Sequence, residues 1–170
     1  KNNGYTTALC GVEHVAQGQS GRDECAGYDV VLPTEQSKAQ EVAPLVCDFL
    51  KSQTDKPFFI SVGLQETHEP WHEPDSVNHP AEDERHCAPP APLPDTQRVR
   101  RDVAHYKAAA RIMDECYGQI LDTLAETGLD KETLVFCFAD HGLQFPRHMC
   151  NLTDTGLEVY LVVRGPENGP

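Results

Sequence analysis

Short apolar runs and one-sided apolar stripes alternate along the chain. Residues 5–10 are apolar enough for a short strand that ends at Gly11. Residues 58–64 (FFISVGL) are apolar on both faces and rich in β-formers, which predicts a buried strand of a parallel sheet. Residues 133–138 (TLVFCF) predict a second buried strand, and residues 157–163 (LEVYLVV) predict a third.

Stripes at helical spacing separate these strands. Apolar residues between positions 42 and 50 recur at i, i+3, i+4, i+7 and i+8, which predicts a helix that has Pro44 in its first turns and ends by Lys56-Pro57. A longer helix is predicted to start at residues 94–96 and to stop at Gly128. Its stripe consists of Ile112, Met113, Cys116, Tyr117, Ile120, Leu121 and Leu124. This alternation indicates an α/β fold, a largely parallel sheet with helices on both faces.

Two stretches lack such patterning. Residues 16–36 have few apolar positions and predict a loop. Residues 65–96 carry four histidines, and their prolines at 70, 74, 80, 89, 90, 92 and 94 are too dense for a helix or a central strand. A loop of this length inside a compact domain is often functional. No repeat or domain boundary is visible, so residues 1–170 are expected to belong to one domain.

The charge balance excludes several classes of function. The chain has 27 acidic residues against 14 lysines and arginines, a net charge of −13. Nucleic-acid binding needs a basic footprint, so no nucleic-acid partner is expected. A polyanionic substrate would need a metal or a local group of cations to reverse the field. No apolar run approaches the roughly 20 residues of a membrane span.

Seven cysteines are present without a CxxC pair, which argues against a zinc ribbon and a thioredoxin-like site. Cys47, Cys116 and Cys137 lie inside apolar patterns and are expected to be buried free thiols. Disulfides among the other cysteines stay possible, and the compartment stays open. The triplet Asn151-Leu152-Thr153 fits the N-glycosylation pattern, a weak indication of secretion.

Polar side chains follow the predicted strands where ligands of open α/β sheets bind, beyond the carboxyl ends. His14 follows the strand predicted at residues 5–10, and His68 follows the strand at residues 58–64. Asp140 and His141 follow the strand at residues 133–138. Any one of them alone is more simply a loop or turn residue. Their shared position at one sheet edge favours a functional site, and an aspartate beside an imidazole offers oxygen and nitrogen ligands to a divalent cation.

Residues 68–72 (HEPWH) match the zinc-protease pattern H-E-x-x-H. That chemistry needs both histidines on one helix face, and Pro70 makes such a helix improbable, so we reject it. The group His72, His79, His86 and Cys87 matches no standard metal spacing and is better explained as a polar loop. Phosphate-loop, dinucleotide and G-x-S-x-G patterns are absent.

Several segments together resemble the sulfatase family, in its order and roughly its spacing. Residues 4–14 (GYTTALCGVEH) resemble its GY-x-T-x-x-x-GK-x-H segment, and residues 57–68 (PFFISVGLQETH) its PFFL-x-V-x-x-x-x-PH segment. Residues 93–106 are very like sulfamidase-type members. Residues 113–142 follow the family pattern that ends in SDHG, and residues 145–147 (FPR) and 152–166 its last segment. The resemblance implies an alkaline-phosphatase-like fold.

The activity implied by this resemblance is hydrolysis of sulfate esters or sulfamates by a formylglycine made from cysteine, with a divalent cation, usually calcium. Carried over by position, Asp140 and His141 match two metal ligands. His14 matches the histidine that assists the formylglycine hydroxyl, and His68 the histidine near the sulfate and leaving group. The implied substrate is a sulfated small molecule or glycosaminoglycan-type saccharide. Secreted, lysosomal and periplasmic locations are all compatible.

The chain also departs from the family pattern. None of the seven cysteines lies in the C-x-P/A-x-R context of the modified cysteine, which we expect upstream together with paired aspartate ligands. Val12 stands where the GK-x-H lysine belongs, Met149 about where a later sulfate-contacting lysine belongs, and Thr153 replaces the Tyr of LYD. We therefore expect an internal fragment that is inactive as a lone chain. The alternatives are a phosphatase or phosphonate hydrolase of the same superfamily and a non-catalytic, degenerate homologue.

Overall fold

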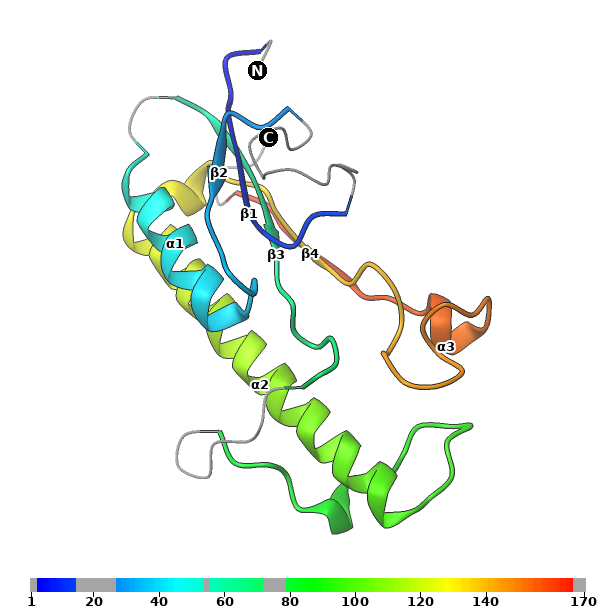
Figure 1. The fold of residues 1–170 in the computed structure, drawn as a ribbon. Helices are drawn as coiled ribbons and strands as arrows, with labels where there is room; N and C mark the ends of the chain where they lie inside the picture. The colour runs from blue at the N-terminus through cyan, green and yellow to red at the C-terminus, as the bar shows by residue number, and fades with distance from the viewer. Residues whose placement is uncertain (1–2, 15–26, 54–55, 72–78, 167–170) are drawn as a thin grey trace. The chain divides into compact units, whose positions relative to one another are not determined.

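The computed structural model describes residues 3–14, 27–53, 56–71 and 79–166, which belong to two compact units (Figure 1). The first unit comprises residues 1–66 and 112–127, and the second comprises residues 67–111 and 128–170. In chain order the elements are β1 (Thr6–Gly11), β2 (Val30–Leu32), α1 (Ala39–Lys51), β3 (Phe58–Gly63), a 3-10 turn (Glu84–His86), α2 (Gln97–Glu126), a second 3-10 turn (Leu129–Lys131), β4 (Val135–Phe138), α3 (Asp154–Leu157) and β5 (Leu161–Arg164). None of the described helices is long and apolar enough to span a membrane.

A three-stranded parallel sheet in the order β2-β1-β3 forms the first unit. The β1–β3 register runs from Thr6 opposite Phe58 to Gly11 opposite Gly63. The apolar runs predict both strands, but the predicted burial of β3 is wrong, since none of its residues is buried and Phe59 is 54% exposed. The three residues of β2 lie inside a stretch predicted to be loop, so that prediction is wrong there. Asp29 fixes this short edge strand, because its carboxylate accepts bonds from the Thr7 backbone N–H and hydroxyl at 3.1 and 2.9 Å. Three residues are too few to show a pattern in the sequence.

Helix α1 buries its apolar stripe in the first unit, including Val42, Val46 and Leu50 at 0–2% exposure. The helix ends at Lys51, before the predicted stop, and contains Pro44. Its first N–H groups lack helical partners, and Lys38 at the N-cap supplies no side-chain bond. The Glu66 carboxylate instead accepts from the Ala39 N–H at 2.7 Å, which explains why this acidic residue is buried.

Helix α2 ends as predicted, with Gly128 just beyond it at φ 73. Within the first unit, Ile112 and Cys116 of α2 form a buried cluster with Ala39 and Ala43 of α1, and Leu64 and Ile120 pack against this cluster. The 3.6-residue stripe of the sequence is thus the buried face of this part of the helix.

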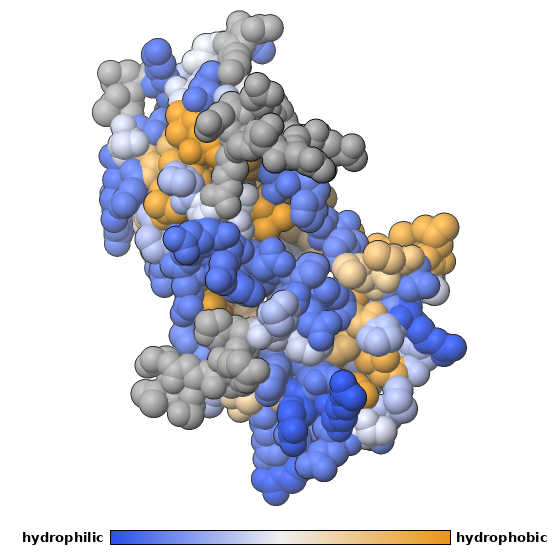
Figure 2. Space-filling model, in the orientation of Figure 1, coloured by the Kyte–Doolittle hydropathy of each residue, from blue (hydrophilic) through white to orange (hydrophobic). Residues whose placement is uncertain are grey.

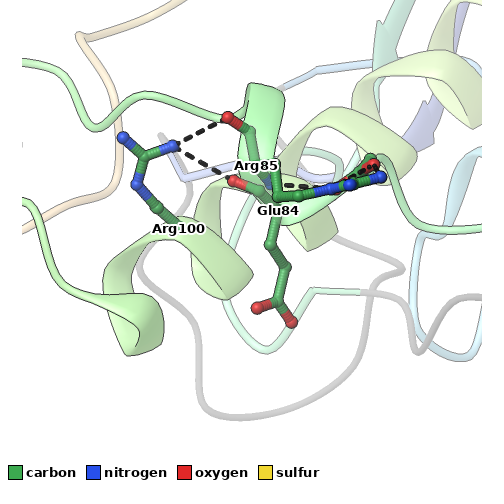
Figure 3. A network of polar contacts seen from close by, with 4 residues as sticks. Glu84, Arg85 and Arg100 are labelled. Atoms are coloured by element: carbon green, nitrogen blue, oxygen red, sulfur yellow. Dashed lines mark hydrogen bonds and ion pairs between the residues drawn. The ribbon is translucent and has the colours of Figure 1, made fainter.

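Arginines of α2 hold the proline-rich segment of the second unit (Figure 3). Arg100 donates to the carbonyl oxygens of Glu84 and Arg85 at 3.3 and 3.0 Å and pairs with Asp95. Arg101 pairs with Glu84 at 3.0 Å. Prolines remove donors from this segment, so side-chain donors bind its carbonyl groups instead.

Trp71, Tyr106 and Phe145 form an aromatic cluster in the second unit, with ring centroids 5.1–6.5 Å apart. Phe145 also belongs to a buried cluster with Cys87, Val103 and Ala104. The cluster connects the end of the proline-rich segment, the start of α2 and the segment after β4.

The strands β4 and β5 differ from the prediction. They pair antiparallel with each other, Phe136 opposite Val163 and Phe138 opposite Leu161, as a separate two-stranded sheet. Leu157 belongs to α3 rather than to a strand. The predicted burial of β4 is also wrong, since Phe136 and Phe138 are 57% and 60% exposed. Apolar side chains of this kind are typical of a strand that other elements cover, and the described residues do not cover β4.

The cysteine predictions are confirmed at two of three positions. Cys47 and Cys116 are buried free thiols. Cys137 is a free thiol too, but it is only half-buried because it lies on β4. Burial raises the pKa of the Cys116 thiol to about 11, with Glu66 adding to the effect.

Candidate functional site

Two glycines bring the carboxyl ends of β1 and β3 close together in the first unit. A Cβ atom on Gly11, whose φ is 90, would overlap the carbonyl oxygen of Gly63, and one on Gly63 would overlap that of Val12. The Val12 N–H donates to the Gly63 oxygen at 2.8 Å. His14 follows this contact by two residues and is exposed. The close approach therefore positions the segment that carries His14.

His68 lies in an exposed turn of the second unit, and its ring is held from both sides. Its Nδ1 lies 2.6 Å from the Glu69 carbonyl oxygen, and a carbonyl only accepts, so Nδ1 carries the proton. Gln144 accepts from the Glu69 backbone N–H through Oε1, which turns its amide nitrogen toward His68 Nε2 at 3.3 Å. Nε2 is therefore the acceptor in a neutral ring. The sequence predicts His68 but not Gln144, which lies 76 residues away along the chain.

Asp140 and His141 follow β4 directly, as predicted, and are adjacent in space. His141 Nδ1 donates to the Gly142 carbonyl oxygen at 2.9 Å, so in the neutral ring Nε2 holds the lone pair. This nitrogen lies 3.7 Å from Asp140 Oδ1. Both side chains are largely exposed, at 41% for His141 and 74% for Asp140.

Gly142 fixes the turn that holds this pair. Its N–H donates to the Gly156 carbonyl oxygen at 3.0 Å. A Cβ at position 142 would overlap the Thr155 carbonyl oxygen, so no larger residue fits. The turn of Asp140, His141 and Gly142 is therefore held in place by the segment before β5, which packs against its glycine.

The donor geometry fits two ligands of one divalent cation. Ligands that each lie about 2.0–2.6 Å from a cation are about 3–4 Å apart when they coordinate at right angles. The separation of Asp140 Oδ1 and His141 Nε2 falls in that range, and the backbone bond of His141 fixes the tautomer that a metal requires. No group of three or more potential ligands occurs among the described residues.

The rejected zinc-protease pattern is also absent from the structure as a helix. His68, Glu69 and Pro70 form bends, and His72 lies outside the described residues. The group of His72, His79, His86 and Cys87 is accordingly described only in part. Cys87 is fully buried in the cluster that it forms with Val103, Ala104 and Phe145, and it offers no exposed thiol.

The three predicted site residues of the second unit are His68, Asp140 and His141, whereas His14 belongs to the first unit. Val12 and Met149, which replace the family lysines, are both half-buried. The Met149 N–H donates to the Leu143 carbonyl oxygen at 3.0 Å within the turn that follows Gln144.

Solved structures place this architecture in the alkaline-phosphatase-like class of α/β folds. The lipoteichoic acid synthase LtaP from Listeria monocytogenes matches 98% of this chain and 44% of its own at a TM-score of 0.68 and 16% identity. A protein of the alkaline phosphatase superfamily from Vibrio parahaemolyticus matches 98% of this chain and 40% of its own at a TM-score of 0.51 and 16% identity. The predicted fold class is confirmed.

The sulfatase family model matches residues 1–170, and the chain belongs to the sulfatase family. An endo-4-O-sulfatase from Bacteroides thetaiotaomicron is 34% identical over 65% of this chain and 24% of its own length. The human N-sulphoglucosamine sulphohydrolase is 26% identical over 97% of this chain and 37% of its own length. The chain therefore spans about a quarter to two-fifths of the length of these relatives.

Proposed function

We propose that the protein hydrolyses sulfate esters or sulfamates of a small molecule or glycosaminoglycan-type saccharide, with a divalent cation, calcium by resemblance, at Asp140 and His141. The observation that carries the proposal is this pair of converging donors in a chain of the sulfatase family. One relative is named an N-sulphoglucosamine sulphohydrolase and another an endo-4-O-sulfatase, and these names support a saccharide substrate. The family match favours sulfate over phosphate chemistry.

His68 and His14 are the proposed proton-handling residues. In the neutral ring of His68, Nδ1 holds the proton and Nε2 holds the lone pair, so Nε2 is the atom that accepts a proton from a reacting group. A bound cation would supply positive charge for the sulfate oxygens. The nucleophile, a formylglycine, has no candidate among the seven cysteines of this chain. We therefore propose that the chain is inactive by itself.

Calcium titration of the chain by calorimetry tests the cation proposal. Two ligands predict weak binding, and Asp140→Asn should abolish it because it removes the only carboxylate of the pair. Asp114→Asn on the exposed face of α2 makes the same change away from the site and should leave the titration unaltered. Identical calcium binding in the Asp140→Asn variant would show that Asp140 and His141 are only a strand-end turn.

An aryl sulfate assay with calcium tests the activity. We expect no turnover by the chain alone and turnover by a longer protein that carries a C-x-P/A-x-R cysteine. Turnover by the 170-residue chain would refute the proposed inactivity. A longer protein without that cysteine motif would support the second candidate, a non-catalytic homologue, which Val12 and Met149 favour because neither replaces the positive charge of a lysine.

A further inference from the structure

The second unit contains an open cavity of about 330 Å³ that none of the proposed catalytic or metal-binding residues lines. Its walls are formed by Pro92, Arg147, Asn151, Thr153 and Thr155. Pockets for small ligands have volumes of about 300–1,000 Å³, so this cavity suits a ligand the size of one sugar unit rather than an oligosaccharide.

Arg147 carries the only charge among the five lining residues. Most arginines of the described part of the chain are neutralised by carboxylates: Arg85, Arg100, Arg101, Arg111 and Arg164 form ion pairs. Arg147 forms none with a described residue. In a protein with a net charge of −13, this side chain provides the local cation that an anionic ligand needs.

The turn around Arg147 holds its backbone in a conformation that favours glycine. The φ of Arg147 is 70, which is uncommon for a residue with a side chain. Hydrogen bonds on both sides keep the turn in place: the His148 N–H donates to the Phe145 carbonyl oxygen at 3.0 Å, and the Thr153 hydroxyl donates to the Arg147 carbonyl oxygen at 3.4 Å. The guanidinium is thus attached to a fixed backbone, which lowers the entropic cost of binding.

The remaining lining groups match the rest of a sugar. Thr153 and Thr155 contribute hydroxyls 3.4 Å apart, and Asn151 contributes an amide. The Thr153 hydroxyl already donates to the Arg147 carbonyl oxygen and the Asn151 amide nitrogen to the Met149 carbonyl oxygen, so these two groups offer a ligand mainly their oxygen acceptors. Pro92 provides an apolar wall for the C–H face of a ring. Sugars present this combination of hydroxyls and C–H groups, whereas an inorganic anion uses only the guanidinium.

Another cavity of the described residues has the opposite character. It is an open pocket of about 410 Å³ in the first unit, and its lining includes three carboxylates, Asp48, Asp122 and Glu126, with Lys51 as the only cation. An anion is repelled there. Size alone would therefore select the wrong cavity, and charge distinguishes the two.

We propose that the Arg147 cavity binds an anionic sugar unit. The guanidinium binds a sulfate or carboxylate group with two parallel hydrogen bonds, and the threonine hydroxyls and Asn151 bind ring hydroxyls. The choice of a saccharide rests on the proposed function. The anion site itself rests only on the charge, the fixed turn and the cavity.

Ligand titrations of the 170-residue chain, followed by ¹H–¹⁵N NMR, test this proposal without metal or turnover. The probes are N-sulfoglucosamine, glucuronic acid and the neutral N-acetylglucosamine. We expect the anionic sugars to shift the resonances of residues 147–155, with at least about tenfold weaker binding of the neutral sugar, because a hydrogen bond to a charged group is lost. The ranking of the first two probes shows whether the anion is a sulfate or a carboxylate.

Arg147→Gln should weaken binding of the preferred anionic sugar by about tenfold or more. Arg98→Gln is the matched control, since Arg98 is exposed in the same unit and has no ion pair with a described residue, and it should leave affinity unchanged. Arg147→Lys keeps the charge but loses the forked geometry, so it should bind with intermediate affinity. Circular dichroism melting checks that each variant is folded.

Thr155→Val separates the sugar from the anion. It should weaken binding of the anionic sugar by about 2- to 10-fold and leave inorganic sulfate binding unchanged. Equal affinity of Arg147→Gln and the parent chain, equal losses in Arg147→Gln and Arg98→Gln, or equal binding of the neutral sugar would each overturn the proposal. Failure of the aryl sulfate assay leaves these binding results intact, so the two proposals fail independently.

Discussion

Strand β1 of the first unit and the β4–β5 pair of the second are both apolar and bury their side chains very differently. Phe59 of β3, in the same sheet as β1, is itself 54% exposed. In β1, Ala8, Leu9 and Cys10 are 0–2% exposed. In the β4–β5 pair, Phe138 and Leu161 lie opposite each other and are 60% and 64% exposed. Figure 2 shows further apolar surface in the second unit around α3, where Leu152 is 92% exposed.

The difference shows that an apolar sequence does not by itself bury a strand, because other elements must cover its faces. Strands that are apolar on both faces are typical of the centre of a parallel sheet covered by helices. The first unit supplies part of that cover for β1 through α1, where the Cys10 thiol lies 4.0 Å from the Val42 carbonyl oxygen. The described residues supply no equivalent cover for β4.

Gly11→Ala should give the largest effect, because it removes the close approach on which the first sheet depends. A Cβ at position 11 meets backbone rather than a movable side chain, and a φ of 90 is unfavourable for alanine. We expect a loss of about 2–5 kcal/mol in the free energy of unfolding, measured by urea denaturation.

Gly118→Ala is the matched control in the same unit. A Cβ there meets nothing within 4 Å, and Gly118 lies in the interior of α2, so alanine should stabilise the chain by about 1 kcal/mol. A Gly11→Ala variant as stable as the parent would show that the β1–β3 contact is loose in solution.

Leu9→Ala and Phe138→Ala compare the two regions directly. Leu9 is 2% exposed, so its truncation should cost about 2–5 kcal/mol. Phe138 is 60% exposed and should cost about 1 kcal/mol or less. Thermal and urea unfolding of both variants measures the contrast. Equal losses would mean that β4 is covered in solution, and the comparison between the regions would then fail.

The buried thiol of β1 should make the stability of the chain sensitive to alkali. Burial, with Glu41 adding to it, raises the pKa of Cys10 from 9.0 to about 11. Between these values the unfolded chain loses the proton that the folded chain keeps, so stability should fall as the pH rises from 9 to 11. Cys10→Ala should flatten this fall relative to the parent.

Alkylation gives a second measurement of the same contrast. The half-buried Cys137 and the exposed Cys150 should react with iodoacetamide in the native protein before Cys10 does. Peptide mass spectrometry over time follows each site. Reaction of Cys10 as fast as Cys150 would contradict the burial of β1.

Local periodicity predicted much of the fold. The stripe of α2, its stop at Gly128 and the strands β1 and β3 are visible in the sequence because each repeats a pattern over several residues. The two-sheet pairing was not predicted, since apolar strands do not specify partners or direction. The edge strand β2 is too short to show a pattern.

Strand ends and resemblance predicted the site residues individually, and their roles stay predictions. Gln144, which contacts His68, and Arg147, which lines the cavity of the second unit, were not predicted as site residues. Gln144 and Arg147 lie in a turn whose geometry depends on contacts with residues 151–156, and no sequence spacing encodes such contacts. A glutamine or an arginine in a loop is ordinarily a solvated side chain, so only the structure distinguishes these two.

The smallest expected effect concerns the contact between Gln144 and His68 in the second unit. Gln144→Leu removes the donor to His68 Nε2, and one hydrogen bond corresponds to about a 2- to 10-fold change in the ratio of the two imidazole tautomers. ¹⁵N NMR of the ring nitrogens should show Nδ1–H dominant in the parent chain and a smaller share in the variant. Gln97→Leu, exposed in the same unit, should leave the ratio unchanged.

Gln144→Glu makes the sharper test, because it nearly preserves shape while replacing the donor with an acceptor. The carboxylate can accept from the Glu69 N–H as Oε1 does, but it faces His68 Nε2 with lone pairs, so that nitrogen should carry a proton in the variant. A ring whose tautomer is the same in the parent, Gln144→Leu and Gln144→Glu chains is not controlled by Gln144. The hydrogen bond to the Glu69 carbonyl oxygen would then determine the tautomer of His68 alone.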